Sequence, residues 1–92
     1  MEFIFDQEKN QKLLQQRGIS FEQVIESIAE GNILLDFQHP NKEKYPNQRI
    51  MVVAIEDYPY CIPYVMDADK IVLKTIFPDR RFKYLLEDYS DE

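Results

Sequence analysis

Residues 49–77 read RIMVVAIEDYPYCIPYVMDADKIVLKTIF and contain three apolar runs separated by two short polar segments. The first run, Ile50 to Ile55, is apolar at every position, whereas a half-exposed strand alternates apolar and polar side chains. A strand without a polar face is usually covered on both sides. We therefore expect this run to form a strand in the centre of a sheet.

The two polar segments, 56–59 and 67–70, have the length and composition of hairpin loops. They predict an antiparallel meander in which the second strand covers Tyr60 to Met66 and the third covers Ile71 to Phe77. Pro63 lies inside the second strand and has no N–H group to donate, which indicates an edge position or a bulge.

Two helices are predicted before the meander. Asp6 is a candidate N-cap for a helix over residues 7–17, and Gly18 is placed to end that helix in a left-handed conformation. Ser20 and Gln23 have the spacing of a capping box for a second helix, which Gly31 would stop.

Apolar positions predict which sides of these helices are buried. In the first helix, we expect Leu13 and Leu14 to point inward. The second helix has an i, i+3, i+4, i+7 stripe, which is typical of an amphipathic helix that packs on a core. The stripe consists of Phe21, Val24, Ile25 and Ile28.

These patterns predict an α+β fold in one domain over residues 1–92. Residues 1–31 would form a helical hairpin, and residues 32–77 a small, mainly antiparallel sheet on which the two helices pack. Residues 78–92 would form a short C-terminal helix over Arg80 to Leu86 and an acidic tail. The longest loop, residues 38–48, contains two prolines and should be exposed.

Composition limits the functional classes. The net charge of −6 argues against a general nucleic-acid-binding protein, but eight of the eleven cations lie within residues 39–83. The single cysteine, Cys61, fits a reducing compartment, and no apolar run approaches the roughly 20 residues of a membrane span. The expected location is the cytoplasm, without membrane contact. One Cys and one His without clustered ligand spacing predict no metal site, and we expect no cofactor.

The N-terminal sequence resembles a known family. The motif Phe-Asp-x-x-Lys-Asn at residues 5–10, followed by Arg-Gly-Ile-Ser-Phe-Glu at residues 17–22, is similar to the opening of the BrnT-type toxins of bacterial type II toxin–antitoxin pairs. The resemblance continues through a loop that ends in Arg49 to the segment KTIFPDRR at residues 74–81.

The resemblance implies a RelE-like fold and a metal-independent ribonuclease that stops translation by cleaving messenger RNA, either free or on the ribosome. It also implies a cognate DNA-binding antitoxin as the protein partner.

Cleavage of this kind needs a group that takes the proton of the 2′-OH and cations that hold the charge on phosphorus. Arg49 and Arg80 are candidates for the cations, and we expect Arg49 to approach Arg80 and Arg81 at one end of the sheet. Lys74 shares a predicted strand face with Val72 and Ile76, and could hold phosphate or carry a proton.

His39 is a candidate general base, although a lone loop histidine is more often incidental. The remaining candidates would bind RNA through charge or by stacking on bases, although packing is the commoner role of tyrosines. They are Arg81, Tyr64, Tyr60 and Lys44.

Two alternatives remain open at this point. The chain could be a degenerate, non-catalytic toxin that only binds its partner protein, or a small regulatory protein that forms a homodimer through its Tyr- and Phe-rich surface.

Overall fold

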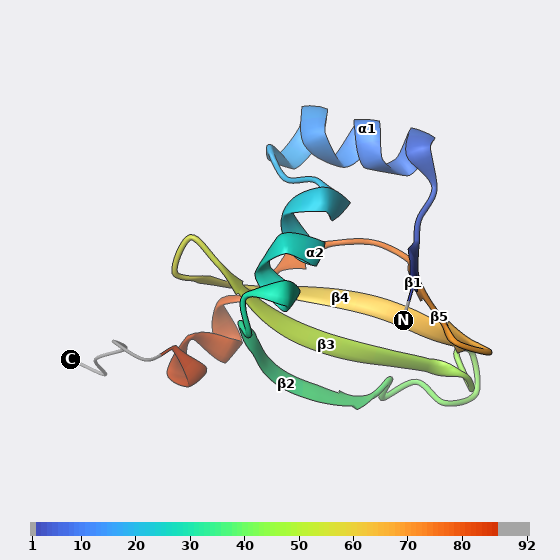
Figure 1. Cartoon of the computed structure of the whole chain (residues 1–92). Helices are drawn as coiled ribbons and strands as arrows, with labels where there is room; N and C mark the ends of the chain where they lie inside the picture. The colour runs from blue at the N-terminus through green and yellow to red at the C-terminus, as the bar shows by residue number, and fades with distance from the viewer. Residues whose placement is uncertain (1, 87–92) are drawn as a thin grey trace.

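The computed structural model describes residues 2–86, and Figure 1 shows how their elements are arranged. The fold is α+β: two helices pack on a mixed sheet that has six strands within the described residues. In chain order, the elements are β1 (Glu2–Ile4), α1 (Gln7–Arg17), α2 (Phe21–Ala29), β2 (Ile33–Gln38), β3 (Gln48–Ile55), β4 (Tyr58–Asp67), β5 (Lys70–Leu73), β6 (Phe77–Pro78) and the 3₁₀ helix η1 (Arg80–Leu85). None of the described helices is long and apolar enough to cross a membrane.

The sheet has the order β1-β5-β4-β3-β2, and β6 pairs with β4 outside this path. All neighbouring strands are antiparallel except β1 and β5, which run parallel. Between β1 and β5 the chain passes through α1, α2 and three strands, which provides the long connection that a parallel pair requires. The predicted meander is therefore present, with an N-terminal strand added at its edge.

Strand β3 lies between β2 and β4 and is buried on both faces, as its uniformly apolar sequence predicts. Met51, Val53 and Ile55 face the side on which both helices lie, which we call the helix face. Ile50 and Val52 point to the other side, which we call the η1 face because Phe82 of η1 packs there. In Figure 1, α2 lies next to the sheet and α1 lies beyond it.

The first hairpin turn is tighter than predicted. Only Glu56 and Asp57 separate β3 from β4, and both have positive φ angles, of 53° and 60°. Two central residues with positive φ are characteristic of a type I′ turn, whose twist matches that of the flanking strands. Pro59 therefore belongs to β4 rather than to the loop, and pairs with Ala54 of β3.

The prediction of a third strand from Ile71 to Phe77 is wrong. Strand β5 ends at Leu73, and the chain leaves the sheet until β6 begins at Phe77. The interruption lies beside Pro63, which is in the interior of β4 rather than at an edge. A proline there is tolerated because β5 pairs with β4 only from Tyr64 onward and β6 only at residues 60–61, so Pro63 has no ladder partner on that side.

The caps of both helices are confirmed. The Asp6 side chain accepts a hydrogen bond from the backbone N–H of Lys9, and Gly18 ends α1 with a φ of 68°. Ser20 and Gln23 form the predicted capping box of α2. Each cap satisfies backbone groups that a helix end would otherwise leave without a partner.

The prediction that Leu13 and Leu14 both point inward is only half right. Leu13 is 4% exposed and packs in the core, whereas Leu14 is 48% exposed.

The inward position that the sequence did not indicate belongs to Asn10, which is buried. Its side chain accepts a hydrogen bond from the backbone N–H of Phe21 at 2.7 Å and donates one to Glu22, also at 2.7 Å. This bond from Asn10 is the largest cause of a lowered pKa at Glu22. Asn10 thus joins α1 to the start of α2.

Candidate functional site

A polar cluster lies on the helix face, near the start of β3. The carboxylate of Asp36 in β2 accepts hydrogen bonds from two side chains, one on each of its oxygens. Arg49 Nε donates to Oδ1 at 3.1 Å, and the hydroxyl of Tyr64 in β4 donates to Oδ2 at 2.7 Å. We call these three residues the Asp36 cluster.

Strand register places the three side chains together. Arg49 pairs directly with Tyr64, and their side chains point to the same face because paired residues of antiparallel strands do so. Asp36 pairs with Met51, two positions along β3 from Arg49, and is therefore a diagonal neighbour on that same face. The cluster spans the three strands β2, β3 and β4.

Solvent can reach one side of the cluster but not the other. The side chains of Asp36 and Arg49 are 41% and 44% exposed, whereas Tyr64 is only 5% exposed and belongs to the core. Burial raises the pKa of the Tyr64 phenol, and its hydrogen bond to Asp36 raises it further. The phenol therefore stays protonated at neutral pH and acts as a fixed donor that holds the carboxylate in place.

This arrangement suits acid–base chemistry on an anionic substrate. A carboxylate that accepts one hydrogen bond on each oxygen keeps further lone pairs for a proton from solvent or substrate. The guanidinium of Arg49 uses Nε for Asp36, and its outer nitrogen atoms can bind phosphate oxygens. A proton acceptor and a phosphate-binding cation thus lie within one hydrogen bond of each other.

Arg80 and Arg81 lie elsewhere, which corrects the expectation that they approach Arg49. Both belong to η1, and the Arg81 side chain lies with Asp79 and Cys61. Cys61 packs on the η1 face, whereas Arg49 points to the helix face. The predicted grouping failed because the chain leaves the sheet after β5, and η1, which follows β6, packs on the face opposite to Arg49.

Lys74 does not share a strand face with Val72 and Ile76. It follows the end of β5 and is exposed, whereas Ile76 is fully buried. Its backbone N–H still donates to the carbonyl oxygen of Pro63 at 2.9 Å. The Lys74 side chain lines a surface hollow beside α1, together with those of Lys9 and Lys12. Its proposed role with phosphate remains a prediction.

The other candidates occupy the loop between β2 and β3 and the middle of β4. His39 Nδ1 accepts a hydrogen bond from the backbone N–H of Asn41, and its ring lies 4.5 Å from that of Tyr45. Lys44 is exposed and lies over the Tyr45 ring. Tyr60 shares the helix face with Tyr64 and is partly buried against the core. Within residues 2–86, neither His39 nor Lys44 makes a hydrogen bond to the Asp36 cluster.

Sequence reasoning missed Asp36. It is the only charged residue in the strand-forming run from Ile33 to Gln38, which is a signal that the sequence does contain. The partners of Asp36 are not visible from sequence, because they lie 13 and 28 residues away along the chain. Within the described residues, no group of three or more His, Cys, Asp or Glu side chains could hold a metal ion.

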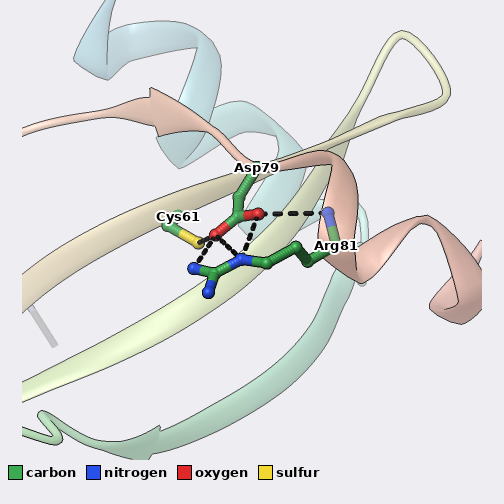
Figure 2. Close-up of polar contacts among 3 residues, drawn as sticks. All are labelled: Cys61, Asp79 and Arg81. Atoms are coloured by element: carbon green, nitrogen blue, oxygen red, sulfur yellow. Dashed lines mark hydrogen bonds and ion pairs between the residues drawn. The ribbon is translucent and has the colours of Figure 1, made fainter.

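A second polar group lies on the η1 face, as Figure 2 shows. Asp79 caps η1 by accepting a hydrogen bond from the backbone N–H of Arg81, and it also accepts from Nε and Nη2 of the same side chain. These bonds lower the pKa of Asp79. The thiol of Cys61 lies 4.0 Å from the Asp79 carboxylate. Asp79 thus holds the Arg81 guanidinium beside the sheet.

Cys61 is expected to be unreactive in the folded protein. Burial, and secondarily the charge of Asp79, raise its pKa to about 11. At pH 8 the thiolate fraction is therefore more than about 100-fold lower than in an unfolded chain, whose cysteine pKa is about 8.5. Iodoacetamide should label the native protein at least that much more slowly than the urea-unfolded protein, measured by mass spectrometry. Equal rates would contradict the burial of this thiol.

The same pKa sets the direction of a pH effect. Because the pKa of Cys61 is higher in the folded than in the unfolded chain, its protonated thiol contributes to the free energy of unfolding below about pH 8.5. This contribution disappears as the pH rises towards 11. A Cys61→Ser variant should lose this alkaline part of the stability profile.

The fold and the Asp36 cluster together define a small α+β domain that carries a carboxylate–guanidinium–phenol site on its sheet. A family model described as "Domain of unknown function (DUF4258)" matches residues 11–78. The chain belongs to this family. The matched range contains the whole Asp36 cluster and ends before η1. No curated protein and no solved structure gives a match.

Proposed function

We propose that this protein is the toxin of a type II toxin–antitoxin pair and inhibits translation as a metal-independent messenger RNA endoribonuclease with a RelE-like fold. The observation that carries the proposal is the Asp36 cluster, which joins a proton acceptor to a phosphate-binding cation on a solvent-accessible sheet face. Two further points support it: the resemblance of residues 3–83 to BrnT-type toxins, and the frequent occurrence of DUF4258 proteins in toxin–antitoxin-like contexts.

In the proposed reaction, the 2′-OH of the RNA attacks the adjacent phosphorus. The carboxylate of Asp36 takes the proton of that hydroxyl, and the outer N–H groups of Arg49 bind the phosphoryl oxygens as negative charge builds up on them. The bond from phosphorus to the 5′-oxygen breaks, which leaves a 2′,3′-cyclic phosphate. Water protonates the departing 5′-oxygen, since solvent reaches the exposed sides of Asp36 and Arg49.

Tyr64 has a positioning role in this proposal. Its hydroxyl donates to Asp36 Oδ2 and keeps the carboxylate turned towards Arg49. The base-stacking role considered for Tyr64 does not suit a ring that is packed in the core. Lys44 and Lys74 are exposed cations that could hold phosphates further along the RNA.

The proposal is tested by adding the purified chain to a cell-free translation reaction and following both protein output and template RNA length. Wild type should shorten the template and stop protein synthesis. Arg49→Ala should leave the template intact, and Arg17→Ala, which changes an exposed arginine at the end of α1, should behave like wild type. An intact template and normal output with wild type would reject the nuclease and favour the non-catalytic binding module.

A further inference from the structure

A cavity of about 380 Å³ lies on the η1 face, behind the Asp36 cluster. Its walls include the rings of Phe37, Phe77 and Phe82, which come from β2, β6 and η1, and the side chains of Ile50 and Cys61 on the sheet. The rings of Phe37 and Phe82 lie 6.0 Å apart in a tilted arrangement. A hollow with several aromatic walls fits a flat, apolar group.

The charged residues that line this cavity are Asp79 and Arg81, which form an ion pair. The segment 80–86 contains Arg80, Arg81 and Lys83 and no acidic residue, in a chain whose net charge is −6. Only Arg81 of these three lines the cavity. Asp79 holds its guanidinium through Nε and Nη2, and Nη1 makes no hydrogen bond within residues 2–86. Since 81% of the Arg81 side chain is exposed, Nη1 can bind an external anion.

We propose that this cavity binds one unpaired ribonucleotide, with the base among the phenylalanine rings and the phosphate on Arg81. A flat apolar body joined to an anion matches both halves of the site, because unstacked bases pack on aromatic side chains and arginine binds phosphate through its planar fork. An apolar side chain of a protein partner would use the walls but would leave Nη1 of Arg81 without a hydrogen-bond acceptor.

The position of the cavity relates it to the proposed cleavage. Asp36 and Phe37 are consecutive in the edge strand β2, so their side chains point to opposite faces, and the same holds for Arg49 and Ile50 in β3. An RNA strand that passes over the β2 edge would contact the Asp36 cluster on one side and the cavity on the other. The inference rests on the proposed function for its ligand, and adds a base-binding subsite to it.

Binding can be measured without cleavage, by NMR or calorimetric titration with the four nucleoside 5′-monophosphates and the matching nucleosides. Wild type should bind at least one monophosphate about tenfold more tightly than its nucleoside. Arg81→Ala should remove this preference while still binding the nucleoside. Arg80→Ala is the matched control, because Arg80 is the adjacent arginine and does not line the cavity. It should keep the preference.

A second variant protects the test against a folding defect in Arg81→Ala. Phe82→Leu keeps an apolar side chain on the sheet but removes a ring, and should weaken monophosphates and nucleosides equally. The inference would be overturned if wild type showed no binding signal at millimolar nucleotide. It would also be overturned if Arg80→Ala and Arg81→Ala lost the preference for the monophosphate equally. Nucleotide binding by a wild-type protein that does not cleave RNA would reject the proposed function and leave the subsite standing. RNA cleavage by a protein that binds no mononucleotide would support the proposed function and overturn the subsite.

Discussion

Asp36→Asn is expected to lower the rate of RNA cleavage by about 10²–10⁴-fold, which is the usual contribution of a general base. Asparagine has the same shape: its amide oxygen can replace Oδ1 and accept from Arg49 Nε, and its NH2 group can replace Oδ2 and donate to the Tyr64 hydroxyl, which can also act as an acceptor, so the fold should be preserved. The change removes the basic oxygen that takes the proton of the 2′-OH. The measurement is the single-turnover rate on a labelled RNA, with circular dichroism as the folding check.

The control for this experiment is Asp67→Asn, an exposed aspartate at the end of β4. It changes the net charge by the same amount and should cleave at the wild-type rate. If Asp36→Asn cleaves as fast as Asp67→Asn, Asp36 is not the base, and the role assigned to the cluster is wrong.

Leu13→Ala is expected to destabilise the protein by about 2–5 kcal/mol, because it removes a buried side chain and leaves a cavity between α1 and the core. Leu14→Ala, one position along the same helix, should change the free energy of unfolding by no more than about 0.5 kcal/mol, since Leu14 is largely exposed. Urea denaturation of the two variants beside wild type measures the difference.

This pair of variants also tests which side of α1 faces the core. The two leucines have the same chemistry and nearly the same helix context, so intrinsic helix propensity cancels between them. Equal destabilisation would contradict the packing of α1 described above.

Local sequence signals predicted most of the fold. The uniformly apolar run 50–55 identified the central strand, because a strand with two apolar faces needs cover on both sides. The caps at Asp6 and Ser20 were visible because they need only residues within one helical turn. Such features depend on neighbours in sequence, which are known without the structure.

Predictions failed where distant residues decide the outcome. Strand β5 stops at Leu73 because Pro63, ten residues earlier, interrupts the ladder, and this places Lys74 outside the sheet. Leu14 looked equivalent to Leu13, but only one of them faces α2 and the sheet. In each case the competing factor is a tertiary contact that no local pattern encodes.

The candidate site was predictable only in part. Arg49 and Tyr64 were identified separately, as a cation at the start of β3 and an aromatic residue in β4. The face on which their common partner, Asp36, lies depends on the register of β2 against β3. This register includes an irregularity between Ile33 and Leu35. A shift of one residue would turn the carboxylate to the other face, so its position had to come from the structure.

The most direct test of the account is the chemistry of the RNA ends produced by the purified protein. A defined RNA is incubated with the protein in EDTA, beside a copy that carries a single 2′-deoxy residue at the cleaved position, and the products are identified by mass spectrometry. The account predicts cleavage in EDTA that gives a 2′,3′-cyclic phosphate and a 5′-hydroxyl, and no cleavage at the 2′-deoxy position. Cleavage of the 2′-deoxy copy, or activity that EDTA abolishes, would contradict it.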